Sequence, residues 1–151
     1  MSDSAAWERS DLQWQVIITI ADNLNAAGIR YHFDASTILF VHGIDIEMDD
    51  VDISLQWDRF QEAYAILSMY EPTPIVYKKG WHQFHVDFDG VDVHFLSAEG
   101  MTMLSAQSER VQLTRGRTIF WSKAVAFYRR HLEDDHPWVP RIDQFLKDRQ
   151  S

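Results

Sequence analysis

The sequence has no cysteine and few basic residues: 14 Lys and Arg stand against 23 Asp and Glu, so the formal net charge is −9 at pH 7. Without cysteine the chain can form neither a disulfide nor a thiolate metal site, which leaves carboxylate oxygens as the natural ligands of a hard cation. The shortage of positive charge argues against general DNA or RNA binding, because phosphate backbones attract basic surfaces.

The sequence also lacks long apolar runs, internal repeats and low-complexity linkers. No run approaches the roughly 20 apolar residues of a membrane-spanning helix, and residues 1–11 do not resemble a signal peptide. We therefore expect no membrane contact and a cytoplasmic location. The 151 residues, 46% hydrophobic and 13% aromatic, predict one packed domain, residues 1–151, with a core at about 11–97 and a C-terminal helical part at about 101–149.

Hydrophobic periodicity predicts the elements of the first half of the chain. Residues 11–28 have apolar side chains at helical spacing, with Ser10 as the expected N-cap and Gly28 as the stop. A short strand over residues 29–33 should follow. An aromatic stripe at helical spacing predicts a further helix over residues 57–69.

Two aspartates separated by one valine are the most informative feature of the sequence. Asp50 and Asp52 begin a segment, ending at Leu55, in which polar and apolar residues alternate. This alternation predicts a strand with both carboxylates on one face. Two carboxylates so close together repel each other unless both point into water or a hard cation lies between them. The residues alone therefore leave two interpretations, a polar strand face or a cation site.

The segment before this strand carries a family resemblance. A small residue and Ser36 are followed by Thr37 and an apolar run that ends near Gly43. This arrangement, ahead of Asp50-Val51-Asp52, resembles the nucleotidyltransferase superfamily with its DNA polymerase β-like fold, and especially its compact bacterial abortive-infection and lincosamide-resistance members. The resemblance implies an α/β (α+β) fold, a small mixed sheet flanked by helices. Residues 37–42 could be strand or helix by pattern; the resemblance favours a helix whose start would bind nucleotide phosphates.

Asp89-Gly90 is the preferred dipeptide of a two-residue hairpin turn. In the register that this turn sets, Asp87 pairs with Asp92 and His85 pairs with His94. The resemblance assigns the third catalytic carboxylate to Asp92, which lies in a Val-Asp-Val-His segment, and leaves open whether Asp87 shares that role. The two histidines could be a transition-metal pair or ordinary hydrogen-bonded surface residues.

The C-terminal third differs in charge from the rest. Residues 110–151 carry nine Lys and Arg against five Asp and Glu. Such a segment could face an anion in the same cleft as the acidic residues, or it could be a solvated helix. We predict a helix over residues 118–131 and a last helix over residues 141–149. The resemblance makes Lys123 a triphosphate contact, whereas the residues alone also allow a partly buried lysine stem.

The resemblance implies a nucleotidyltransferase that uses Mg²⁺ or Mn²⁺ and moves a nucleoside monophosphate from a triphosphate such as ATP to a hydroxyl group of a small molecule or protein. The implied catalytic and metal-binding residues are Asp50, Asp52 and Asp92. The implied nucleotide-binding residues are Ser36, Thr37 and Lys123.

Two other functions stay open at the level of sequence. The first is a catalytically inactive, antitoxin-like interaction domain, favoured by Ala35 where the family has glycine and by the acidic side chains of Asp45, Glu47 and Asp49. The second is a metal-dependent hydrolase that uses the same carboxylates and His94 on a different fold. The sequence leaves the acceptor, the preferred triphosphate, and a protein partner or homodimer undetermined.

Overall fold

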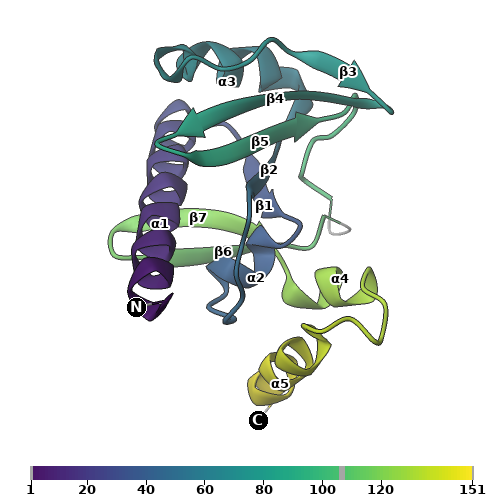
Figure 1. Ribbon diagram of the computed structural model, residues 1–151. Coiled ribbons are helices and arrows are strands. Elements are labelled where there is room, and N and C mark those ends of the chain that lie inside the picture. Colours follow the sequence, from purple (N-terminus) through teal and green to yellow (C-terminus); the bar gives the residue numbers. More distant parts are fainter. Residues whose placement is uncertain (1, 106–107, 151) are drawn as a thin grey trace.

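The computed structural model describes residues 2–105 and 108–150 (Figure 1). The helices are α1 Ser2–Ala27, α2 Thr37–Val41, α3 Phe60–Ile66, α4 Val125–Arg130 and α5 Val139–Gln150, with short 3₁₀ turns η1 Trp57–Arg59 and η2 Ser68–Tyr70. The strands are β1 Tyr31–Asp34, β2 Val51–Leu55, β3 Val76–Lys78, β4 Trp81–Phe88, β5 Val91–Ser97, β6 Arg110–Arg115 and β7 Thr118–Lys123. Within these residues no helix is both long and apolar enough to cross a membrane.

Seven strands form one mixed sheet in the order β3-β4-β5-β2-β1-β7-β6. The pairs β2/β5 and β1/β7 are parallel, and the other neighbours are antiparallel. Helices flank this sheet, with α4 and α5 near α2 at one end of it (Figure 1). The predicted α/β (α+β) class, a mixed sheet flanked by helices, is confirmed.

One face of the sheet is apolar and is covered by α1 and α3. Trp14 of α1 packs against Phe120 of β7, with ring centroids 5.9 Å apart, and Phe60 of α3 packs against Phe84 of β4 at 5.5 Å. The strands alternate, so every second residue is buried on this face; among them are Phe33, Val51, Ile53, Phe84, Val86, Phe88, Val91, Val93 and Phe95. The other residues of the same strands point to the opposite, polar face.

Most of the predicted elements of the first hundred residues are present. The helix over residues 37–42 that the resemblance favoured is α2, and the Asp-Val-Asp strand is β2. The first helix begins at Ser2, well before the expected N-cap at Ser10, so that cap prediction is wrong. The hairpin is confirmed residue by residue, because Asp87 pairs with Asp92 and His85 pairs with His94.

The predicted helix over residues 118–131 is wrong in its first half. Thr118–Lys123 forms strand β7, which pairs with both β6 and β1, and only Val125–Arg130 is helical. Both the strand propensity of these residues and their pairing with neighbouring strands explain the difference. Thr118, Ile119, Phe120 and Trp121 are β-branched or aromatic residues that favour strands, and two neighbouring strands supply their backbone hydrogen bonds. Arg110–Arg115 is likewise a strand, β6, inside the part at about 101–149 that was predicted to be helical.

Candidate functional site

A row of polar side chains crosses five strands on the polar face of the sheet. Asp34 pairs with Asp52, Asp52 pairs with His94, and His94 pairs with His85. Lys123 of β7 adjoins Asp34, because the residues before them, Ser122 and Phe33, are register partners in the parallel β1/β7 pair. The row therefore runs from a lysine through two aspartates to two histidines, and it joins segments from four separate parts of the chain.

Asp50 and Asp92 lie beside this row, one step toward the beginnings of the parallel strands β2 and β5. Asp50 is exposed, and its carboxylate interacts with its acidic neighbours. Partial burial, and then the negative charges of Asp92 and Asp52, raise the pKa of Asp50. The three carboxylates predicted to act together thus share one face and one electrostatic environment.

Asp52 is fixed at both its backbone and its side chain. Its backbone N–H donates to the Oγ1 of Thr37, which is fully buried, over 2.9 Å. Its Oδ1 lies 3.3 Å from Nδ1 of His94. Tyr128 of α4 also approaches this carboxylate: partial burial, and then the charge of Asp52, raise the pKa of Tyr128. Sequence reasoning had not pointed to Tyr128, since a helical aromatic residue is usually part of the core.

Asp92 and Asp87 oppose each other across the hairpin but have different partners. The two carboxylate oxygens of Asp92 lie 3.0 and 3.2 Å from Nδ1 of His85. Asp87 instead accepts a hydrogen bond of 2.6 Å from the backbone N–H of Gly90 in the turn. The two acids therefore have separate hydrogen-bond partners, and Asp92 is the one that contacts a histidine of the row.

Asp34 is a site residue that sequence reasoning missed. It accepts a hydrogen bond from Ser54 Oγ (3.1 Å) and one from the backbone N–H of Ala35 (2.9 Å). Burial favours its neutral form, but nearby His32, the Ala35 N–H and Lys123 outweigh that effect and lower the pKa of Asp34. The available signal was its position, at the end of a strand and directly before the turn that resembles a phosphate-binding loop.

Ala35, Ser36 and Thr37, the residues at the turn before α2, differ in burial and in backbone conformation. Ala35 is exposed and has a positive φ of 52°, a conformation that glycine adopts most easily. Ser36 is half-buried at the N-cap position and makes no side-chain capping hydrogen bond. Thr37 has no exposed surface. The half-buried Ser36 hydroxyl can reach a ligand. The buried Thr37 hydroxyl instead accepts the backbone N–H of Asp52.

Lys123 is on strand β7 and not on a helix. Its Nζ lies 3.7 Å from the centroid of the Phe127 ring, and its charge acts on His32 and Asp34. A lysine at this point supplies positive charge at one end of an otherwise acidic row. Lys123 therefore lies next to Asp34, on a strand and not on the predicted helix.

The donor set fits a hard divalent cation. Three aspartates offer only oxygen ligands, which Mg²⁺ and Mn²⁺ prefer. Asp50 carries the like-charge repulsion that a cation would relieve. Across residues 2–105 and 108–150, no three His, Asp or Glu side chains are arranged closely enough to hold a metal ion as they stand. Asp52 contacts His94 through Oδ1 alone, whereas both oxygens of Asp92 face His85, so rotation of the Asp92 side chain has to precede joint coordination.

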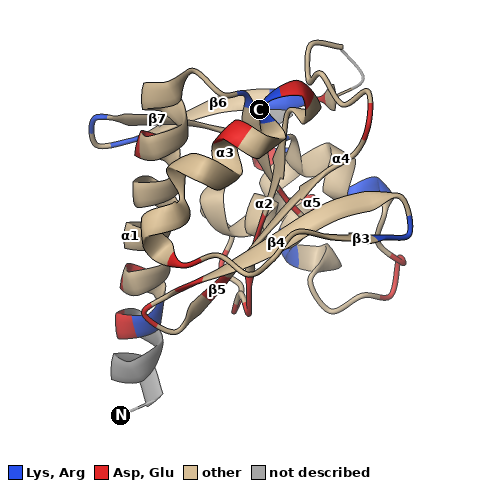
Figure 2. Cartoon of the chain, turned by 90° about the horizontal axis from the view of Figure 1, so that it is seen from above, with Lys and Arg blue, Asp and Glu red and all other residues tan. Residues whose placement is uncertain are grey.

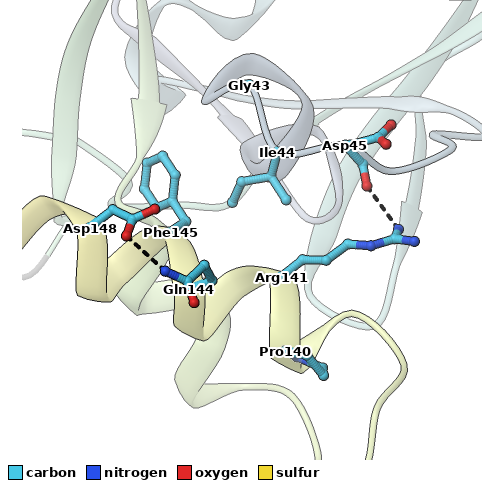
Figure 3. Close-up of a pocket in the computed structure, with 8 residues that line it drawn as sticks. All are labelled: Gly43, Ile44, Asp45, Pro140, Arg141, Gln144, Phe145 and Asp148. Atoms are coloured by element: carbon cyan, nitrogen blue, oxygen red, sulfur yellow. Dashed lines mark hydrogen bonds between the residues drawn. The ribbon is translucent and has the colours of Figure 1, made fainter.

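Two of the cavities beside the segment that leads into β2 are also lined by Arg141 of α5. The first, of about 490 Å³, separates Gly43, Ile44 and Asp45 from α5, and Arg141 bridges it by donating to the carbonyl oxygen of Asp45 (Figure 3). The second, of about 540 Å³, shares Asp45 and Arg141 with the first and extends to Asp49, the residue before Asp50. There is thus room for a ligand next to the acidic residues.

The charged residues are unevenly distributed over the molecule (Figure 2). Lys and Arg occupy the two hairpin turns on opposite margins, β3–β4 and β6–β7, and Asp and Glu occur at β5 as well as on α1 and α3. The link into β2 is acidic on its exposed side, where Asp45, Glu47 and Asp49 alternate with buried Ile44, Ile46 and Met48. A negatively charged ligand would therefore meet like charge along this approach.

Comparison with known proteins gives structural neighbours only. No protein-family model matches the sequence, and neither does any curated protein. A candidate nucleotidyltransferase from Thermotoga maritima superposes with a TM-score of 0.64 at 13% identity, over 91% of each chain. ANT(2'')-Ia, solved in complex with adenylyl-2''-tobramycin, superposes with a TM-score of 0.62 at 13% identity, over 89% of each chain. Its solution structure gives 0.58 at 10% identity, over 91% of this chain and 82% of that one.

Proposed function

We propose that this chain, which has the nucleotidyltransferase fold, transfers a nucleoside monophosphate from a nucleoside triphosphate to a hydroxyl group of a small molecule or protein. The observation that carries the proposal is the grouping of Asp50, Asp52 and Asp92 on one face of two neighbouring parallel strands. The fold rules out the hydrolase on a different architecture. ANT(2'')-Ia, whose complex contains an adenylylated tobramycin, shows that the fold supports modification of a small molecule.

In the proposed reaction the acceptor oxygen attacks the α-phosphorus, and pyrophosphate leaves with the electron pair of the broken P–O bond. Asp92 accepts the proton of the acceptor hydroxyl, for which its half-exposed carboxylate is accessible. Asp50, Asp52 and Asp92 would hold Mg²⁺ or Mn²⁺, which neutralises phosphate charge and lowers the pKa of the hydroxyl. Ser36 and Lys123 would bind the outer phosphates, and Thr37 would hold the strand that carries Asp52.

A second candidate is the inactive interaction domain. Ala35 replaces a glycine in a left-handed conformation, and the exposed acids Asp45, Glu47 and Asp49 oppose the approach of a bare triphosphate. Both features are compatible with a fold that has kept its architecture and lost turnover. The two candidates differ in whether the protein releases pyrophosphate.

The test is a pyrophosphate-release assay with each common nucleoside triphosphate, Mg²⁺ or Mn²⁺, and a panel of hydroxyl-bearing acceptors. We expect release that depends on one class of acceptor and that falls at least about 100-fold in Asp92→Asn, the range that general-base catalysis supplies. Release in water alone, without an acceptor, would indicate hydrolysis. No release with any combination would favour the interaction domain.

A further inference from the structure

The imidazole of His94 on β5 lies between Gln83 of β4 and Asp52 of β2, the two strands on either side of β5. Its Nδ1 lies 3.3 Å from Asp52 Oδ1, and its Nε2 lies 2.6 Å from Oε1 of Gln83. Gln83 on β4 is paired with Leu96 on β5, one step from His94 along the polar face. The imidazole is thus held at both nitrogens, and its orientation toward Asp52 is determined by Gln83.

The proton positions follow from the chemistry of the three groups. Both ring nitrogens face oxygen atoms, and a neutral imidazole carries only one N–H. A half-turn of the Gln83 amide places its NH₂ group against Nε2 and leaves the N–H on Nδ1, facing Asp52. A charged ring would donate from both nitrogens. A neutral ring with its proton on Nε2 would turn a lone pair toward the Asp52 carboxylate, which is unfavourable, so the favoured states are those in which Nδ1–H donates to Asp52.

His85 repeats the arrangement one strand away. Its Nδ1 faces both carboxylate oxygens of Asp92, and its ring stacks on that of His94 with centroids 4.3 Å apart and an angle of 5° between the planes. Each of the two carboxylates on β2 and β5 therefore has its own histidine. The stacked pair fixes the lateral position of both rings, since neither can turn without displacing the other.

We propose that Gln83 and His94 are positioning residues that orient the carboxylate of Asp52 for a divalent cation, with the stacked ring of His85 supporting them. This inference rests on the proposed function of the same site. A carboxylate ligand whose remaining lone pairs are hydrogen-bonded loses less freedom when it binds a metal, and such outer partners typically change metal affinity 10–100-fold. His94 does not itself touch the substrate in this scheme.

Packing alone does not explain a histidine at this position. The side chain of His94 is 22% exposed, and the next residue of β5 on the same face is Leu96, so the face accepts an apolar side chain there. His94→Leu should therefore fold. A loss of cation affinity in that variant would come from the missing donor.

The experiment measures Mn²⁺ binding to the free protein by electron paramagnetic resonance, without nucleotide or acceptor. We expect His94→Leu to weaken Mn²⁺ binding 10–100-fold and Gln83→Leu to weaken it less. His94→Asn should recover part of the loss, because the Asn amide nitrogen occupies the position of Nδ1. His82→Leu is the matched control: His82 is on the same hairpin but on the opposite face, against Trp57, and its loss should leave Mn²⁺ affinity unchanged.

The results distinguish failure of this inference from failure of the proposed function on which it rests. If wild-type protein and His94→Leu bind Mn²⁺ equally, the positioning role is overturned while the nucleotidyltransferase proposal stands. If His94→Asn is as weak as His94→Leu, or if His82→Leu loses affinity to the same extent, the donor at Nδ1 is not the cause and the inference fails. If the wild-type protein binds no Mn²⁺ and releases no pyrophosphate, the proposed function fails with it.

Discussion

At the scale of single residues, Ala35 occupies a backbone conformation that suits glycine. The left-handed conformation, with φ of 52°, costs a residue with a Cβ about 1–2 kcal/mol, whereas glycine loses roughly 0.4–1 kcal/mol through its freer unfolded state. We predict that Ala35→Gly leaves the free energy of unfolding unchanged or raises it by up to about 1.5 kcal/mol. Urea denaturation measures this. The control is Ala65→Gly on the exposed side of α3, which should lose about 1 kcal/mol because Ala65 is helical.

Thr37 is the buried residue that connects α2 to the site. Its Oγ1 accepts the backbone N–H of Asp52, so Thr37→Val would leave that donor unpaired. We predict a loss of about 1–3 kcal/mol in the free energy of unfolding, the usual effect of an unsatisfied buried donor. Thr114→Val on the exposed edge strand β6 should stay within about 0.5 kcal/mol of wild type. Equal effects of the two substitutions would contradict this account of Thr37.

One buried histidine, His32, and one partly buried histidine, His42, predict how stability depends on pH. Burial lowers the pKa of His32 and of His42 below their ordinary value of 6.5. The unfolded chain therefore binds more protons than the folded chain below about pH 6.5, and these residues make stability fall as the pH is lowered from there. We predict a smaller fall between pH 7 and pH 5 in His32→Leu and in His42→Leu than in wild type, measured by urea denaturation at each pH. Unchanged slopes in both variants would contradict the prediction.

At the scale of elements, the β4–β5 hairpin depends on its turn. Asp89 and Gly90 have positive φ values of 53° and 93°, and a Cβ at Gly90 would meet no atom within 4 Å. Gly90→Ala should therefore act through backbone conformation alone and cost about 1–2 kcal/mol of unfolding free energy. Asp89→Asn is the control and should stay within about 0.5 kcal/mol, because Asn tolerates the same conformation. Thermal denaturation of both variants tests this.

The elements that could be predicted from sequence are those with local signals. The turn residues Asp89-Gly90 set the register of the hairpin, and period-two alternation after Asp50 identified β2. Strand β7 was mistaken for a helix because its pattern is short and its stability comes from β6 and β1, which lie elsewhere in the chain. The start of α1 was missed for a related reason: Ser10 suits an N-cap, but the helix continues past it to Ser2.

At the scale of the whole molecule, the site is assembled by pairings that no local pattern shows. Asp52 meets His94 and Asp34 meets Lys123 through the parallel β2/β5 and β1/β7 pairs. Sequence could therefore name Asp50, Asp52 and Asp92 by resemblance. It could not show that Asp34 joins them, that His85 and His94 face the carboxylates, or that the Thr37 hydroxyl is turned inward to the backbone of Asp52.

The negative charge of the molecule determines in which form a triphosphate can bind. The net charge is −9, and the exposed acids of the link into β2 lie beside the site. A bare triphosphate would meet repulsion at short range, so it should bind together with its cation. A triphosphate without a divalent cation is therefore not expected to stabilise the protein, whereas the two together are.

The most direct test of the central claim, that Asp50, Asp52 and Asp92 bind a cation with a nucleoside triphosphate, is the melting temperature of the protein with each common triphosphate at millimolar concentration. With Mg²⁺ present we predict a rise for at least one triphosphate, since a ligand at about 100 times its dissociation constant adds roughly 2.7 kcal/mol. The same triphosphate with a chelator should give no rise, and Asp52→Asn should abolish the shift while melting as cooperatively as wild type. An unchanged melting temperature with every triphosphate, or an equal rise in Asp52→Asn, would contradict the claim.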